Sequence, residues 1–294
     1  MYLQLGEKHL SCKVERVDKP MDEKSSFRLW LVAAGLCVLL CAFTAFGLAI
    51  LLPEASGTET LEKGGAVVDV SHSDQGYIMV SRASGKAQKL RLSVGKASLN
   101  YDLSGTGEYE VFPLQLGNGK YKVEIFEQVS GKKYSPVASV SFSAKLEEPW
   151  MPFLYPNQYI SYNADTKAVA KSMEICANAT TDAEKVEAVY EYMINNMQYN
   201  YAFAAEVGRG MHKGYIPTVD ATLEEDMGVC FDFSALIACM LRAQGIPTQL
   251  TIGYADKTYH AWNTVLVDGE WKLYDATMVI CQGQVKNYTA ERNY

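Results

Sequence analysis

The chain has 294 residues, of which 48% are hydrophobic and 21% charged, so it is long enough for two modest folded domains. Its formal net charge is -7 and it has no dense cluster of Lys and Arg, which excludes the basic surface that a nucleic-acid partner requires.

The first predicted element is an apolar stretch from Leu29 to Leu52 that contains no charged residue. It exceeds the roughly 20 residues that a helix needs to cross a bilayer, and the apolar part of a cleaved signal peptide is shorter, about 7–15 residues. Basic residues are frequent before this stretch and scarce just after it. Because Lys and Arg resist translocation, we expect a cytoplasmic tail (1–28), a transmembrane helix (29–52) and an extracytoplasmic remainder. The expected location is the cell membrane, crossed once.

A polar, glycine-containing stretch (53–65) suits a short linker, and a strand-rich region follows it. Short runs that alternate, or that are rich in β-branched and aromatic residues, are separated by Gly, Asn, Asp and Ser turns. This pattern predicts a small antiparallel β-sandwich of the immunoglobulin type over residues 66–146. The expected strands are 66–70, 77–82, 89–94, 108–114, 121–127 and 136–144.

Helical periodicity dominates the start of the last region, residues 147–294. Thr181 stands three residues before Glu184, the spacing of a capping box, in which each side chain accepts a hydrogen bond from the other residue's backbone. The helix predicted after it has one apolar face, formed by Val186, Val189, Tyr190, Met193, Ile194 and Met197.

A second helix is predicted to begin at Cys230 and to end before Gly245 and Pro247. Strand-like runs follow at 248–255, 260–268 and 271–277, and a tight Asp268-Gly269 turn joins the last two. A helix followed by an antiparallel sheet predicts the α+β class.

The thiol of Cys230 is the first candidate for chemistry. At the first turn of a helix, unpaired backbone amides favour a thiolate, which makes the sulfur a better nucleophile. A lone cysteine is more often a small buried hydrophobe, as we expect for Cys239. No pair with zinc-site spacing occurs, and a disulfide between Cys176 and Cys281 is left open.

A thiolate also needs a base, and the base needs an acceptor that orients it. Of the four histidines, His260 alone begins a strand in the last region, whereas His212 lies in a polar loop. Asp275 lies near the end of the next strand, nearly opposite His260 in an antiparallel ladder. These three residues form a candidate Cys-His-Asp triad.

The segments GVCFDFSALIACMLRAQGIP (228–247), TIGY (251–254) and YHAWNTVLVDGEWKLYDAT (259–277) resemble the core of the transglutaminase-like superfamily. Weaker similarity extends back to about Tyr159, and residues 1–150 are not covered. The resemblance implies a papain-related α+β fold in residues 147–294. In that fold Cys230 is the nucleophile, His260 the general base and Asp275 the residue that orients it. After Asp275 the chain reads Ala276, Thr277 and Met278, which departs from the usual family sequence without removing a triad member.

An intact triad implies a thioester intermediate formed from an amide or ester and then passed to water or to an amine. We expect a peptide or protein substrate at the cell surface, no cofactor and no metal. Tyr199, Tyr201 and Trp262 are candidates to line the substrate cleft, although each is an ordinary core residue type. The alternative is a catalytically inactive surface protein that serves for binding or as a scaffold.

Overall fold

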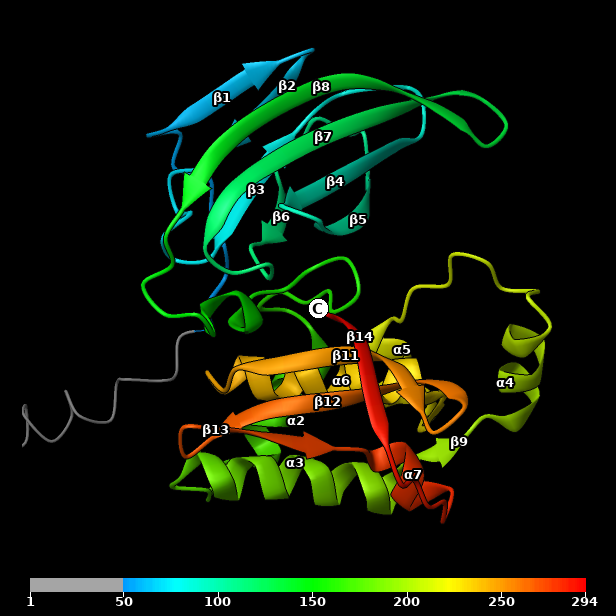
Figure 1. The fold of residues 1–294 in the computed structure, drawn as a ribbon. Coiled ribbons are helices and arrows are strands. Elements are labelled where there is room, and N and C mark those ends of the chain that lie inside the picture. The colour runs from blue at the N-terminus through cyan, green and yellow to red at the C-terminus, as the bar shows by residue number, and fades with distance from the viewer. Residues whose placement is uncertain (1–49) are drawn as a thin grey trace, which may run out of the picture. The chain divides into compact units, whose positions relative to one another are not determined.

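The strand-rich region consists of two antiparallel sheets of four strands each. The computed structural model describes residues 50–294 (Figure 1). One sheet has the order β1-β2-β3-β6 and the other β5-β4-β7-β8. Their bounds are β1 Thr60–Lys63, β2 Ala66–Asp69, β3 Tyr77–Ser81, β4 Gln88–Val94, β5 Ala97–Leu103, β6 Glu110–Pro113, β7 Gly119–Ser130 and β8 Lys133–Ala144. The six predicted strands are all present, and their assignment to the immunoglobulin type stays a prediction.

Two strands of these two sheets, β1 and β5, were not expected from the sequence. β1 lies inside the stretch predicted to be a linker (53–65), where Leu61 packs against the core and the strand pairs with β2. β5 alternates apolar and polar residues, and its buried side chains are Leu99, Tyr101 and Leu103. That alternation is the normal signal of a half-buried strand, so β5 was recognisable from the sequence.

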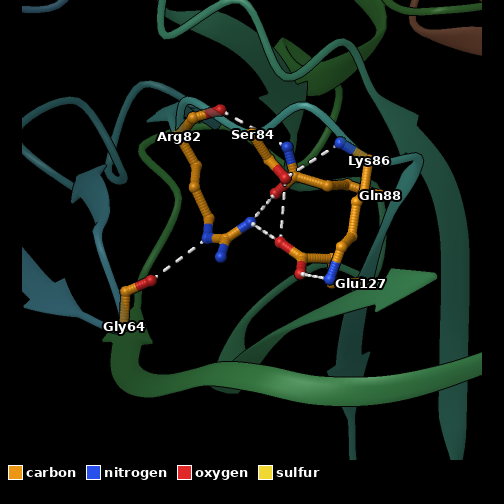
Figure 2. Close-up of polar contacts among 6 residues, drawn as sticks. All are labelled: Gly64, Arg82, Ser84, Lys86, Gln88 and Glu127. Carbon is orange, nitrogen blue, oxygen red and sulfur yellow. Dashed lines mark hydrogen bonds and ion pairs between the residues drawn. The ribbon is translucent and has the colours of Figure 1, made fainter. Parts of the chain in front are cut away.

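A polar cluster joins the two sheets at one edge (Figure 2). Arg82 donates to the carboxylate of Glu127 at 3.0 Å and to the carbonyl oxygen of Gly64 at 3.1 Å. Ser84 donates to the same carboxylate at 2.8 Å, and Lys86 pairs with it at 3.3 Å. The hydrogen bond from Ser84 and then that from Arg82 lower the pKa of Glu127 to about 2. Glu127 therefore stays ionised and holds these loops together.

The last region places helices against one antiparallel sheet of order β13-β12-β11-β14. Helix α6, which begins at Cys230, contacts β11 and β12 on one side and α2 and α3 on the other (Figure 1). The sheet strands are β11 Thr248–Ala255, β12 Thr258–Val267, β13 Glu270–Tyr274 and β14 Tyr288–Asn293. The helices are α2 Lys167–Ile175, α3 Asp182–Asn196, α4 Tyr201–Gly208, α5 Val219–Glu225, α6 Cys230–Ala243 and α7 Ala276–Ile280, with a short 3-10 turn η1 at Met151–Leu154. Helices packed on an antiparallel sheet agree with the predicted α+β class.

Local predictions around this sheet are confirmed, with one correction. The Thr181–Glu184 capping box begins α3, and Asp268 and Gly269 both have positive φ in the turn between β12 and β13. The strand expected over 271–277, however, ends at Tyr274. Asp275 instead accepts a hydrogen bond from the Met278 backbone N–H and caps α7.

The four cysteines of the described region, Cys176, Cys230, Cys239 and Cys281, are all free thiols. The bridge left open between Cys176 and Cys281 is therefore absent. Cys176 is buried, and its thiol donates to the Lys185 carbonyl oxygen instead. Cys239 is fully buried, as predicted.

Within residues 50–294, no helix has the length and apolar character that crossing a bilayer requires. The predicted tail (1–28) lies outside the described residues, and so does almost all of the predicted span (29–52).

Candidate active site

The N-terminal turn of α6 holds Cys230 at its first helical position, with a partly exposed side chain. Asp232 fixes this turn because its carboxylate accepts a hydrogen bond from the Val229 backbone N–H at 2.9 Å. Gly228 is needed just before it, since a Cβ there would lie 2.8 Å from the Cβ of Asp232. The thiol is thus set on a rigid element and remains accessible.

His260 is the third residue of β12 and is buried. Its Nε2 lies 2.8 Å from Oδ2 of Asp275, and the cavity that His260 lines is also lined by Cys230. Burial alone would lower the pKa of His260, but hydrogen bonds to Asp275 and to Cys230 outweigh it and raise the pKa to about 9. At neutral pH the imidazole is therefore a cation between the sulfur and the carboxylate.

Asp275 follows the end of β13 and is buried. Besides His260, Oδ2 accepts a hydrogen bond from the Tyr288 hydroxyl at 2.9 Å, and Oδ1 accepts one from the Met278 N–H at 3.1 Å. The carboxylate thus has a fixed orientation, and it remains an acceptor for the imidazole ring.

The strand that holds His260 is also hydrogen-bonded to α6, the helix that begins at Cys230. The side-chain amide of Asn263 on β12 donates to the carbonyl oxygen of Ser234 on α6 at 2.9 Å. Trp262 stacks near the His260 ring with 6.3 Å between ring centroids, and Tyr288 packs against Trp262. These contacts restrict movement of the base relative to the thiol.

A cavity of about 520 Å³ opens onto Cys230 and His260. Tyr199, one of the three predicted cleft residues, lines it, and burial raises the pKa of this tyrosine to about 12. The other two do not line the cavity. Trp262 is buried behind His260, and Tyr201 is largely exposed and packs its ring against Tyr199.

Four residues of the site were missed by sequence reasoning: Asp232, Tyr215, His212 and Tyr288. Asp232 had a usable signal, because an acidic residue at the third position of a helix is a normal capping residue. His212 was assigned to a polar loop, and that loop borders the cavity. Tyr215 and Tyr288 reach the site only through the tertiary fold, by hydrogen bonds to Asp232 and Asp275.

Residues 169–276 match the family model described as the transglutaminase-like superfamily. The match includes Cys230, His260 and Asp275. This segment is a transglutaminase-like domain. Proteins of this superfamily are generally cysteine proteases or acyltransferases.

Individual relatives are more distant. Kyphoscoliosis peptidase from Homo sapiens is 28% identical over 116 residues, which are 35% of this chain and 17% of the human protein. The chain thus spans less than a fifth of that relative.

Two solved structures also resemble the chain. A candidate cysteine protease from Cytophaga hutchinsonii is 21% identical, with a TM-score of 0.39, over 70% of this chain and 71% of the other. The periplasmic domain of TgpA from Pseudomonas aeruginosa is 14% identical, with a TM-score of 0.36, over 76% of this chain and 95% of the other.

Proposed function

We propose that the protein transfers acyl groups from peptide or protein amides through a thioester on Cys230. The observation that carries this proposal is that His260 is hydrogen-bonded to the Asp275 carboxylate at 2.8 Å and lines the same cavity as the Cys230 thiol. An accessible sulfur at a helix start, paired with a cationic imidazole, is the arrangement that a cysteine nucleophile needs.

In the proposed reaction the sulfur of Cys230 attacks the amide carbonyl carbon and forms a C–S bond. The C–N bond then breaks, and the His260 imidazolium gives its proton to the departing amine. Backbone N–H groups of the first turn of α6, including that of Cys230, are placed to stabilise the oxyanion. Water or an amine next attacks the thioester, His260 accepts the proton of that acceptor, and the thiolate is released.

Intact-mass spectrometry of the purified full-length chain with p-nitrophenyl acetate tests the nucleophile. We expect one acetyl adduct, located on Cys230, and the Cys230→Ala variant should lose at least about a thousandfold in acylation rate. Cys281→Ala is the matched control, because it removes a partly exposed thiol outside the triad and should leave the adduct in place. An adduct that persists in Cys230→Ala would overturn the proposal and leave the binding or scaffold role.

The acyl acceptor and the location belong to the same proposal. Incubation of the enzyme with an amide peptide, with and without an added primary amine, separates hydrolysis from transfer by the mass of the products. We place the domain outside the cell, anchored by residues 29–52. Labelling of Cys230 in intact cells by a membrane-impermeant thiol reagent supports that location, and labelling only after lysis contradicts it.

A further inference from the structure

Helix α4 has an apolar sequence, YAFAAEVG, but none of its residues is buried. It stands apart from the sheet and from α6 in Figure 1, and none of the described helices or strands packs closely against it. An apolar helix without a buried face normally has a partner.

The segment that contains α4 is stiffened by its own side chains. Asn200 caps the helix by accepting a hydrogen bond from the Phe203 N–H. The Phe203 ring packs against the rings of His212 and Tyr215, and His212 pairs with Glu206 at 2.7 Å. α4 and the loop after it, residues 200–215, are therefore held in one conformation by contacts within the segment, which we call the α4 segment.

The α4 segment is hydrogen-bonded to the start of α6, on both sides of Cys230. The Asn200 N–H donates to the Gly228 carbonyl oxygen at 2.8 Å, two residues before Cys230. The Tyr215 hydroxyl donates to the carboxylate of Asp232 at 2.6 Å, two residues after it. These two hydrogen bonds fix the position of the α4 segment relative to the Cys230 thiol.

The 520 Å³ cavity lies between the α4 segment and the two residues Cys230 and His260. Ala204, Val207 and Gly208 of α4 line one side of it, and Ile252 and Tyr259 line the other. No Lys, Arg, Asp or Glu side chain of the described residues lines the cavity. Large apolar side chains are exposed beside it, with Met211 62%, Tyr259 53% and Val207 39% exposed. Clustered exposed apolar side chains are typical of a binding surface.

We infer that α4 and Tyr259 form the subsite for a bulky, uncharged apolar side chain of the acyl-donor peptide. The occupant is assigned to the donor because the cavity opens onto the thiol, so this step rests on the proposed function. The His260 imidazolium on this lining is already paired with Asp275, so a charged side chain would lose hydration beside α4 without a free ion partner, whereas an apolar one gains by burial.

Peptide binding to the full-length Cys230→Ala variant tests the subsite without requiring a reaction. The probes are fluorescein-labelled acetyl-Gly-X-Ala-Gly amides with X = Phe, Leu, Asp or Lys, followed by fluorescence anisotropy. We expect the Phe and Leu peptides to bind at least about tenfold more tightly than the Asp and Lys peptides. Equal affinities, or no binding by any of the four, would overturn the inference.

Substitutions in the same background locate the contact. Val207→Asp should weaken the Phe peptide about tenfold, and Val207→Leu should retain its affinity. Val129→Asp is the matched control, because Val129 is 67% exposed and lies on β7, away from the cavity. If Val207→Asp has no more effect than Val129→Asp, α4 is not the subsite.

The acetyl-ester reaction of the wild type keeps the two proposals apart. An adduct on Cys230 without a preference among the peptides overturns the subsite alone. A preference for apolar peptides without any adduct supports the subsite and overturns the acyl-transfer function.

Discussion

At the residue scale, Asp275 and Cys230 favour the protonated form of His260. Its pKa of about 9 lies above the ordinary value of 6.5, because hydrogen bonds to Asp275 and Cys230 outweigh the burial that would lower it. The same two partners are those that the proposed reaction uses. Proton binding by His260 therefore connects the stability of the fold with the proposed chemistry at Cys230.

The stability of the protein should depend on pH through His260. The folded protein binds this proton more tightly than the unfolded chain, so the stabilisation is fully present below about pH 6.5 and is lost as pH rises through about 9. We expect the free energy of unfolding, from urea titrations, to fall between pH 6.5 and pH 9. The fall should be smaller in His260→Gln, and equal slopes in the two proteins would contradict the assignment.

At the scale of elements, β14 has to approach β11 closely for Tyr288 to reach Asp275. The two strands approach closely at Gly253 on β11, where their pairing shifts register between Ile252 and Gly253. A Cβ at Gly253 would overlap the Thr289 carbonyl oxygen and lie 3.0 Å from the Cα of Ala290. The absence of a side chain at Gly253 thus allows β14 to bring the Tyr288 hydroxyl to Asp275.

Gly253→Ala should displace β14 and lower the free energy of unfolding by about 1–3 kcal/mol, the usual cost of overpacking. It should also slow acylation of Cys230, because the hydrogen bond from Tyr288 to Asp275 is lost. Gly85→Ala is the control, since a Cβ there meets no atom within 4 Å, and it should change stability by less than about 0.5 kcal/mol. Chemical denaturation and the ester assay measure both effects, and a wild-type acylation rate in Gly253→Ala would separate β14 from catalysis.

For the whole molecule, Arg242 on α6 is a central polar residue, 1% exposed. Its guanidinium donates to the carbonyl oxygens of Tyr155, Thr248 and Tyr294, which lie in three separate segments of the chain. Burial lowers its pKa to about 10, so it remains charged at neutral pH. One cation thus joins α6 to Tyr155 in the segment before the helices and to Thr248 and Tyr294 at the sheet.

Arg242→Ala should lower the free energy of unfolding by at least about 3 kcal/mol, because three buried carbonyl oxygens lose their donor. Arg91→Ala, at an exposed position on β4, is the control and should cost less than about 1 kcal/mol. Thermal and urea unfolding measure the difference. Similar losses in the two variants would show that water or other donors replace the guanidinium.

Local chemistry was sufficient to predict the elements that carry the triad. The start of α6 at Cys230, the capping box of α3 and the Asp268-Gly269 turn each depend on residues close in sequence. The turn sets the register of β12 against β13, and that register brings His260 toward Asp275. The order of a helix, a turn and two strands was therefore enough to nominate three residues for one site.

Long-range packing decided what local patterns left open. The end of β13 at Tyr274, the place of Tyr288 beside Asp275 and the exposed position of α4 each depend on segments distant in the chain. An apolar run such as YAFAAEVG has the same sequence pattern in a core as beside a cleft. By itself the sequence nominated Cys230, His260 and Asp275 as candidates for chemistry, because residue type and local backbone pattern can be read from it directly. Only the tertiary structure decided which side chains surround them, because those contacts are made across the fold.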